Sequence, residues 1–321
     1  MLHVPGDVEV SVVMSVCNDA RYVAKSIESL LGQEGVSFEL IIVDDGSRDE
    51  TPEILARFAN ADPRIRVIRQ ENQGLTRALI RASGESRGTY LARQDADDVS
   101  LPGRLRKQAD LLDREPSVRL VGCWIRHIGP LGEDLGTWQP SADAFEATRG
   151  LRCGDIKRIR SLGAHGSAMF RRHDYSAVGG YRQEFYFAQD LDLWLRLTEL
   201  GMLAIVPQVL YEWRMSPLSI TGRFRSLQMR TARVILSLAR VREEGGDEGP
   251  LLREAALIRP SDPRGKRLAP GLYFIGKRLL DRKDPRAIGY LKAATAARPW
   301  HIKSWIFLAL AVAMRTVWRR S

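Results

Sequence analysis

Apolar runs of strand length alternate with amphipathic segments over the first hundred residues, and this alternation restricts the folds open to the chain. The strand-like runs span Glu9–Val16, Phe38–Val43, Ile65–Ile68 and Gly88–Ala92, and a helix-like segment follows each of the first three. Repeated strand–helix units build a parallel sheet through right-handed crossovers. We therefore predict an α/β fold with a mainly parallel central sheet flanked by helices, followed by a C-terminal helical extension.

Polar residues stand where these strands should end. Asp44 and Asp45 follow the second run, Asn72 follows the third, and Asp95 and Asp97 follow the fourth. The loops at the carboxyl ends of parallel strands line one crevice, where ligands bind in open α/β sheets. We therefore expect these five side chains to converge.

The acidic stretch Arg93–Asp98 (RQDADD) has the composition of a site for a hard divalent cation. On an extended chain Asp95 and Asp97 would point the same way, because they are two residues apart. Carboxylate oxygens suit Mg²⁺ or Mn²⁺, particularly when phosphates complete the coordination shell. The alternative is a solvated acidic turn, since an isolated Asp-x-Asp is common by chance. The sequence has no glycine-rich phosphate loop, so metal and carboxylates would have to hold any phosphates.

The middle of the chain adds one more candidate carboxylate. Asp190 stands at the start of an apolar-periodic helix, where it could cap the helix or act as a general base, and the pattern leaves both open. Residues 129–150 contain several Gly and Pro residues, which interrupt regular structure, and are expected to form a long loop or insertion over the site. The other expected elements are a helix over 101–115 with a Lys/Arg face and strands over 118–125, 167–170, 203–206 and 209–213.

Net charge is distributed unevenly along the chain. Residues 251–321 contain 16 Lys and Arg against 4 Asp and Glu, whereas the rest of the chain contains 33 against 35. The basic surplus therefore belongs to the tail. A helix over 224–242 and a flexible acidic linker over 243–250 are expected to precede it, and its own helices are expected over 287–297 and 302–314.

Cysteine use and hydropathy indicate where the protein works. The three cysteines show neither a disulfide framework nor zinc spacing, which indicates a reducing compartment. No secretory signal pattern is visible, and the longest apolar run, Trp305–Met314, is about half the length that a bilayer span needs. We expect a cytoplasmic protein, either free or peripheral on the cytoplasmic face of a membrane.

Seven stretches, taken in order, resemble the inverting family 2 glycosyltransferases, whose GT-A fold has a Rossmann-like sheet. They are SVVMSVCNDARYVAKSIESLL, FELIIVDDGSRDET, NQGLTRAL, YLARQDADDVSLPGRLRKQ, HGSAMFRR, GGYR and AQDLDLWLRL, within residues 9–222. The resemblance implies a GT-A domain over 1–222, with a nucleotide-sugar-binding half over about 1–110 and an acceptor half over 111–222. A helix and acidic linker over 223–250 and a basic helical region over 251–321 would follow.

The resemblance also implies an enzyme with a nucleotide-diphosphate-sugar donor, a UDP-sugar being favoured, and a divalent metal, Mn²⁺ or Mg²⁺. Asp190 would be the general base that deprotonates the acceptor hydroxyl in a single in-line displacement. Asp97 would ligate the metal. The donor would be bound by Asp44, Asp45, Asn72, Arg93, Asp95 and Arg214, and the acceptor side would include His165, Gln189 and Trp194.

The tail over residues 300–321 has two interpretations. Trp300, Trp305 and Trp318 accompany an apolar middle with basic ends, as in a helix that lies on an anionic membrane surface. That interpretation suits a glycan or lipid-linked acceptor in cell-surface polysaccharide synthesis. The other is a helix packed on the catalytic domain, or a repeat that binds a partner.

Three further functions share parts of this pattern. A non-catalytic adaptor would keep the transferase fold and bind partners through its helical tail. A nucleotidyltransferase would usually need a glycine-rich loop after the first strand, which the segment SVCNDAR lacks. No nucleic-acid partner is expected, because the basic surplus is confined to the tail and no recognition motif is present.

Overall fold

The computed structural model describes residues 8–159, 162–217, 224–260 and 268–318, with the side chains of the last helix described as far as Met314. Within these ranges a nine-stranded sheet has the order β3-β2-β1-β4-β8-β6-β9-β5, and β7 pairs with β6. The strands are β1 (Val10–Val16), β2 (Phe38–Asp45), β3 (Ile65–Gln70), β4 (Tyr90–Asp95), β5 (Val99–Ser100), β6 (Val118–Ile128), β7 (Asp134–Trp138), β8 (Met169–Arg171) and β9 (Met202–Arg214).

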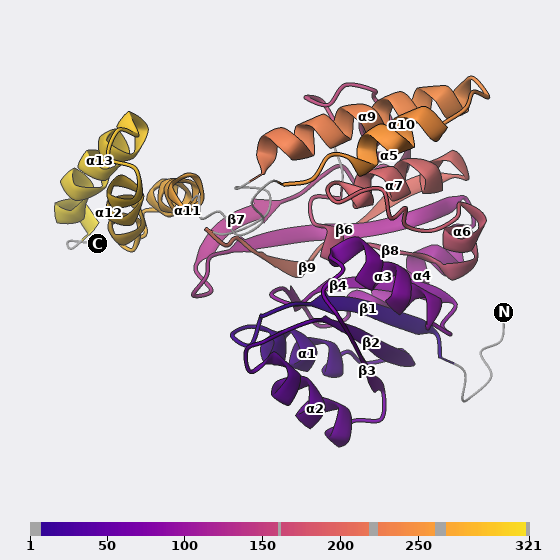
Figure 1. Cartoon of the computed structure of the whole chain (residues 1–321). Coiled ribbons are helices and arrows are strands. Elements are labelled where there is room, and N and C mark those ends of the chain that lie inside the picture. The colour runs from indigo at the N-terminus through magenta and orange to yellow at the C-terminus, as the bar shows by residue number, and fades with distance from the viewer. Residues whose placement is uncertain (1–7, 160–161, 218–223, 261–267, 319–321) are drawn as a thin grey trace. The chain divides into compact units, whose positions relative to one another are not determined.

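The first four strands form the parallel part of the sheet. Strand β1 lies between β2 and β4, β3 pairs with β2, and all three pairings are parallel. Helices α1 (Val23–Leu31) and α2 (Thr51–Ala61) cover one face, and α3 (Leu75–Gly84) covers the other (Figure 1). Right-handed crossovers require this division, because α3 connects strands on opposite sides of β1. The predicted strand–helix alternation and α/β fold are confirmed.

The register brings the strand ends to one edge. Val16 pairs with Asp44, and Ser15 pairs with Asp95 on the other side of β1. Neighbouring strands lie nearly 5 Å apart, so the ends of β2 and β4 are separated by about 10 Å across β1. The acidic ends of two strands therefore flank the same strand at nearly the same level.

The second part of the sheet is antiparallel. Strand β8 pairs in this sense with β4 and β6, and β5 pairs with β9. Among the described pairs, parallel pairing is thus confined to β1–β4. Four helices belong to this half of the fold: α4 (Arg104–Arg114), α5 (Ala144–Leu151), α6 (Arg172–Ala177) and α7 (Gln189–Glu199).

Two expectations for this half can be compared with the structure. The segment 129–150, expected as a long loop or insertion, contains β7 and α5, and the Asp143 carboxylate caps α5 by accepting a hydrogen bond from the Glu146 N–H. The two strands predicted over 203–206 and 209–213 are the single strand β9. Pro207, which separates them in the sequence, is exposed within β9, where its missing N–H is tolerated.

The chain divides into two compact units that are not continuous in sequence. The first comprises Met1–Ile125, Trp138–Trp213 and Met229–Arg259, and the second comprises Arg126–Thr137, Arg214–Gln228 and Pro260–Ser321. The linear boundaries expected at residues 222 and 250 do not coincide with this division.

Residues 243–250, expected to form a flexible acidic linker, include a short connection between two helices. Helix α9 (Arg225–Glu243) is followed within a few residues by α10 (Gly249–Ala256). Between them, the Glu248 carboxylate lies 2.8 Å from the Arg182 guanidinium and 2.6 Å from that of Arg242. These ion pairs fix a segment whose acidic composition indicated solvation.

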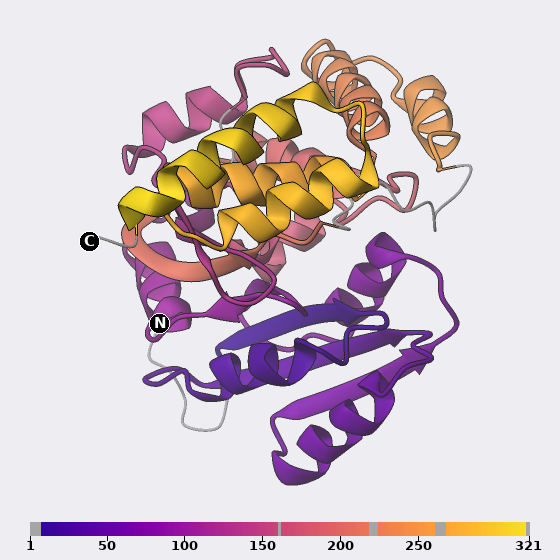
Figure 2. The same ribbon diagram turned by 90° about the vertical axis from the view of Figure 1, so that its left-hand side faces the viewer.

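The second unit contains a group of three C-terminal helices. Helices α11 (Ala269–Asp281), α12 (Ala287–Ala297) and α13 (Ile302–Trp318) pack side by side (Figure 2). Ile275, Leu279, Leu291 and Ala311 form their common core. Within the described ranges, each helix is too short or too polar to cross a bilayer.

Candidate active site

Asp95 ends β4 and begins a tight turn. The Asp98 N–H donates a hydrogen bond to the Asp95 carbonyl at 3.2 Å, so the extended chain assumed for Asp95 and Asp97 is wrong. The Arg93 guanidinium, itself fully buried, lies 2.6 Å from the Asp95 carboxylate, which keeps 28% of its side chain exposed. Asp97 is also partly exposed, whereas Asp98 is buried. Two carboxylates of this turn can therefore be reached by a ligand.

Asp45 holds the segment that leads into α3. Its carboxylate accepts hydrogen bonds from the Gln73 and Gly74 N–H groups and from the Gln70 side chain, each at 2.8 Å. The Asn72 side chain donates to the Asp45 carbonyl at 2.8 Å. The structure thus brings Asp45 and Asn72 together, with Asp45 bonded to its own loop.

Asp44 is buried at the same edge but has fewer partners. One carboxylate oxygen accepts the Ser47 N–H at 2.9 Å. The other lies 3.6 Å from Arg69 Nε and has no hydrogen-bond partner within the described part of the chain. A buried carboxylate oxygen of this kind is suited to accept a donor group from a ligand.

Asp190 is the second residue of α7. The helix begins after Ala188, whose φ of +53° is uncommon for a residue other than glycine. Ala188 occupies the N-cap position, so of the two roles left open for Asp190 the helix cap is excluded. Burial raises the pKa of Asp190 to about 6 and the Asp95 carboxylate adds to this rise, while a hydrogen bond from the Leu191 N–H opposes it.

The predicted acceptor-side residues meet at the start of α7. His165 Nε2 lies 2.6 Å from the Tyr181 hydroxyl, and the imidazole meets the Trp194 ring edge-on. Burial and the nearby Arg93 cation lower the pKa of His165 well below its ordinary value, so the ring is neutral at pH 7. Gln189 and Trp194 are buried, and the Trp194 indole N–H has no hydrogen-bond partner within the described residues.

Electrostatic interactions connect the two sides of the site. Asp190 interacts with both Asp95 and Arg93, and His165 interacts with Arg93. The structure therefore gathers these four predicted residues into one cluster beside the acidic turn. Arg214 lies at the end of β9 in the second unit, where its guanidinium donates a hydrogen bond to the Gly129 carbonyl at 3.1 Å.

Three buried residues of this region were not predicted as site residues: Arg104, Tyr181 and Tyr211. The helix over 101–115 was expected to carry a Lys/Arg face, yet Arg104 of this helix has no exposed surface. The signal that could have identified it is its spacing from Gln108. The two residues are four positions apart, so they share one face of α4, just after the acidic turn.

Asp97 is the residue expected to ligate a divalent metal. Within the described ranges, no group of three or more His, Cys, Asp or Glu side chains is arranged to hold a metal. Mg²⁺ is commonly held by one or two carboxylates together with substrate phosphates. The partly exposed Asp97 therefore fits a metal that a donor diphosphate shares.

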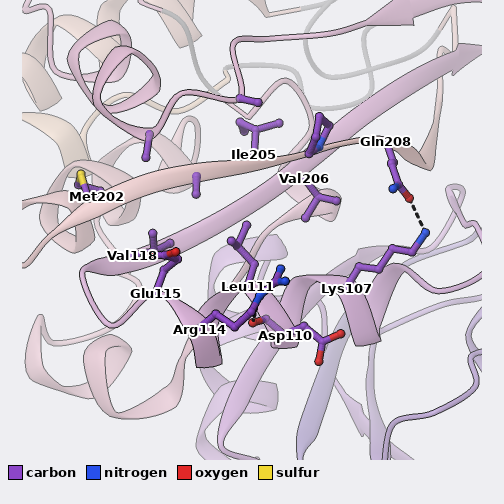
Figure 3. A pocket seen from close by; sticks show the side chains of 14 residues that line it. Lys107, Asp110, Leu111, Arg114, Glu115, Val118, Met202, Ile205, Val206 and Gln208 are labelled. Carbon is purple, nitrogen blue, oxygen red and sulfur yellow. Dashed lines mark hydrogen bonds between the residues drawn. The ribbon is translucent and has the colours of Figure 1, made fainter.

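A cavity of about 620 Å³ lies elsewhere in the first unit, between α4 and the first half of β9. Figure 3 shows Lys107, Leu111 and Arg114 of α4 facing Val206 and Gln208 of β9. None of the predicted site residues is among the described residues that line it. Cavity size therefore does not locate the site, which is marked by its carboxylates.

Comparison with known families identifies the chain. The family model for Glycosyl transferase family 2 matches residues 11–179, which is more than half of the sequence. The chain belongs to the family 2 glycosyltransferases. This glycosyltransferase carries Asp44, Asp45, Asn72, Asp95 and Asp97 within the matched region.

Several curated proteins are similar to this glycosyltransferase over about 60% of its length. EpsE of Bacillus subtilis (strain 168), whose name assigns it provisionally to the glycosyltransferases, is 34% identical over 197 residues, 60% of this chain and 68% of that protein. The O-antigen biosynthesis glycosyltransferase WbnJ of Escherichia coli is 32% identical over 59% of this chain and 71% of its own. Chondroitin synthase of E. coli is 27% identical over 63% of this chain but only 28% of its own.

Solved structures of low sequence identity support the GT-A fold of this glycosyltransferase. The mannosyltransferase PcManGT from Pyrobaculum calidifontis, in complex with GDP-Man and Mn²⁺, matches with a TM-score of 0.55 at 18% identity, over 98% of this chain and 88% of that one. S. aureus TarS 1-349 in complex with UDP-GlcNAc matches with a TM-score of 0.56 at 14% identity, over 95% and 91%.

Proposed function

We propose that this glycosyltransferase is metal-dependent and inverting, and that it moves a sugar from a nucleotide-diphosphate-sugar to a hydroxyl of a glycan or lipid-linked acceptor. The observation that carries the proposal is the pair formed by Asp190 and the acidic turn. Asp190 has its pKa raised to about 6 and interacts electrostatically with Asp95. A carboxyl group with such a pKa is matched to proton abstraction near neutral pH.

On the donor side, the acidic residues at the strand ends would bind the nucleotide. Asp44, with one carboxylate oxygen lacking a hydrogen bond, would accept from the base or ribose. Asp97 would hold the divalent metal, Mn²⁺ or Mg²⁺, which when bound neutralises the diphosphate charge and assists its departure. Asp95, held by Arg93, would contact the ribose.

On the acceptor side, Asp190 would act as general base. Its carboxylate takes the proton of the acceptor hydroxyl as that oxygen bonds to the anomeric carbon. The bond from this carbon to the donor diphosphate breaks at the same time, and its electron pair leaves with the nucleoside diphosphate. Attack from the face opposite the leaving group inverts the anomeric configuration. His165, Gln189 and Trp194 would line the acceptor side, with the neutral imidazole hydrogen-bonded to Tyr181.

The names of relatives guide the choice of product, and the solved structures guide the choice of donor. WbnJ is named for O-antigen biosynthesis, and chondroitin synthase is named for a polysaccharide. We therefore place the activity in synthesis of a cell-surface polysaccharide. The solved structures carry UDP-GlcNAc or GDP-Man, so both bases are candidates. We favour a UDP-sugar, as the sequence resemblance implies.

Release of nucleoside diphosphate tests this function. The purified chain should liberate the diphosphate from one class among UDP-, GDP- and dTDP-sugars, and only when Mn²⁺ or Mg²⁺ is present. Adding a matching acceptor should accelerate the release. Release that is unaffected by a metal chelator would contradict the proposed metal dependence.

The outward face of α13 supports the membrane interpretation of the tail. Ile302 is 71% exposed, Trp305 52%, Ile306 53% and Leu310 48%, and their spacing places them on one stripe of the helix. The opposite face packs on α11 and α12 through Phe307, Leu308 and Ala311. Trp300 is exposed just before the helix. The side chains of Arg315 and Trp318, and residues 319–321, lie outside the described residues.

Charge adds to this argument. Asp284 is the last acidic residue, and seven Lys and Arg follow it before the end of the chain. An apolar helical stripe in a basic segment is the pattern of a helix that lies in the surface of an anionic membrane. We propose that this stripe docks the enzyme on such a surface.

Substituting the α13 stripe should release the enzyme from vesicles. Trp305→Glu with Ile306→Glu is expected to abolish cosedimentation with vesicles that contain phosphatidylglycerol, because two carboxylates would have to enter an anionic interface. Leu257→Glu, at an 82% exposed leucine outside this helix, is the matched control and should bind as wild type does. Equal binding of all three proteins would exclude α13 as the membrane contact.

A further inference from the structure

Arg104 is a fully buried cation at the first position of α4, just after the acidic turn. Its guanidinium donates hydrogen bonds to the Arg93 carbonyl at 2.7 Å and to the Gly166 carbonyl at 2.9 Å. Three further bonds, of 2.8–3.1 Å, reach side-chain oxygens of Gln94, Ser100 and Gln108. One side chain thus connects β4, α4 and the segment that carries His165.

The same guanidinium packs on Tyr211 of β9. Its carbon lies 4.8 Å from the centre of the buried Tyr211 ring. The Tyr211 hydroxyl in turn accepts a hydrogen bond from the Asp95 N–H at 3.2 Å. A path of two contacts therefore leads from Arg104 to the residue that ends β4 at the acidic turn.

Gly166 closes this arrangement from the acceptor side. A Cβ at this position would lie 1.8 Å from the Tyr211 hydroxyl oxygen and 3.0 Å from the Asp95 nitrogen. A glycine is therefore required where the chain next to His165 passes between Tyr211 and Asp95. The donor-side turn and the acceptor-side segment meet here at van der Waals contact.

The energetics make a purely stabilising role a poor explanation. Arginine stays charged in proteins, and burying a cation is costly unless its hydrogen bonds are satisfied. All five acceptors named above are neutral, and the negative charge that favours the Arg104 cation comes from the buried Asp98 carboxylate. Apolar residues of similar volume often stabilise a core equally well. What the planar guanidinium provides is a rigid set of donors that fixes the relative positions of its partners.

We propose that Arg104, together with Tyr211, is a positioning element that sets the distance between the acidic turn and the His165–Asp190 side of the site. This inference rests on the proposed transfer reaction, in which donor and acceptor must be held in line. Arg104 touches neither substrate in this scheme. It acts through Asp95, which it reaches by way of Tyr211, and through Gly166, which it holds directly.

Arg104→Lys tests the proposal, with Arg114→Lys on the exposed side of the same helix as the matched control. Lysine keeps the charge but cannot donate the five hydrogen bonds that the planar guanidinium makes. We expect kcat at saturating donor to fall by about tenfold to a hundredfold in Arg104→Lys, since small misplacements of reacting groups have effects of this size. Arg114→Lys should keep the wild-type kcat. Tyr211→Phe, which removes only the acceptor of the Asp95 N–H, should resemble Arg104→Lys.

A second readout does not require turnover. Asp190 interacts electrostatically with Asp95, Arg93 and Tyr181, and a looser arrangement would admit water and weaken its interaction with Asp95. Carbon-13 titration of the Asp190 carboxyl, assigned with Asp190→Asn, should therefore give a pKa of about 6 in wild type and a value nearer the ordinary 3.8 in Arg104→Lys and Tyr211→Phe.

The possible results distinguish failure of this inference from failure of the proposed transfer function. If wild type transfers no sugar, the proposed function fails. The titration still shows whether Arg104 sets the distance between the acidic turn and Asp190. If Arg104→Lys does not fold, Tyr211→Phe decides alone. Wild-type kcat together with an unchanged Asp190 titration in a folded variant would overturn the positioning role.

Discussion

Replacing Asp190 by asparagine is expected to lower the transfer rate by about 10²- to 10⁴-fold, the usual contribution of a general base. Asparagine keeps the shape and can still accept the Leu191 N–H, but it cannot take a proton at neutral pH. Donor binding should remain close to that of wild type, because Asp190 stands on the acceptor side. Steady-state rates and donor titrations on the same preparation check both parts.

The same substitution should stabilise the protein above pH 6. Because the folded-state pKa of Asp190 is raised, its contribution to stability is fully present below the unfolded-state value of 3.8 and is lost as the pH rises through about 6. One pKa unit corresponds to about 1.4 kcal/mol, so the ionised carboxylate costs the fold roughly 2 to 3 kcal/mol at pH 8.

Denaturant unfolding of wild type and Asp190→Asn measures this difference. The variant should be more stable at pH 8 and equal to wild type below about pH 3, where the Asp190 carboxyl is neutral in both the folded and the unfolded state. The wild-type rate should fall as the pH drops through about 6, as the base becomes protonated. A variant that retains turnover would show that Asp190 is not the general base, and a variant that is less stable at pH 8 would contradict the raised pKa.

Asp97→Ala is expected to abolish metal-dependent binding of the nucleotide-sugar. Within the described ranges the protein offers no three-residue metal site, so loss of one carboxylate should leave the metal to the diphosphate alone. Calorimetric titration of the donor, with and without Mn²⁺, measures the effect.

The matched control is Asp281→Ala, at the exposed end of α11, where the carboxylate pairs only loosely with Lys277 at 3.4 Å. It should bind donor and metal as wild type does. Tight Mn²⁺-dependent binding by Asp97→Ala would remove Asp97 from the metal site and leave the acidic turn a solvated loop.

The parallel half of the fold could be predicted because its signals are local. The β-branched run of β1 and the apolar run of β2 each specify a buried strand, and the polar residues that follow mark the carboxyl edge. Parallel strands joined by right-handed connections have their carboxyl ends at the same edge of the sheet, so these polar residues could be placed together without knowledge of tertiary contacts. The gathering of Asp95 and Asp190 was expected from the order of motifs, since no local rule connects residues so far apart.

The errors concern features that depend on distant partners. For residues 243–250, the sequence does not show that Glu248 forms ion pairs with Arg182 and Arg242. The burial of Arg104 was not predicted, because most of its acceptors, such as the Gly166 carbonyl, lie outside its own helix. The turn at 95–98 read as extended because a single backbone hydrogen bond decides it.

Thermal unfolding with nucleotide-sugars is the most direct test of the central claim that this chain binds such a donor through a metal. A ligand that binds only the folded state raises Tm by mass action. The account predicts that one class among UDP-, GDP- and dTDP-sugars raises Tm in the presence of Mn²⁺ and not in its absence, and that Asp97→Ala removes the shift. Folded protein whose Tm responds to none of the donors, with or without Mn²⁺, would contradict it.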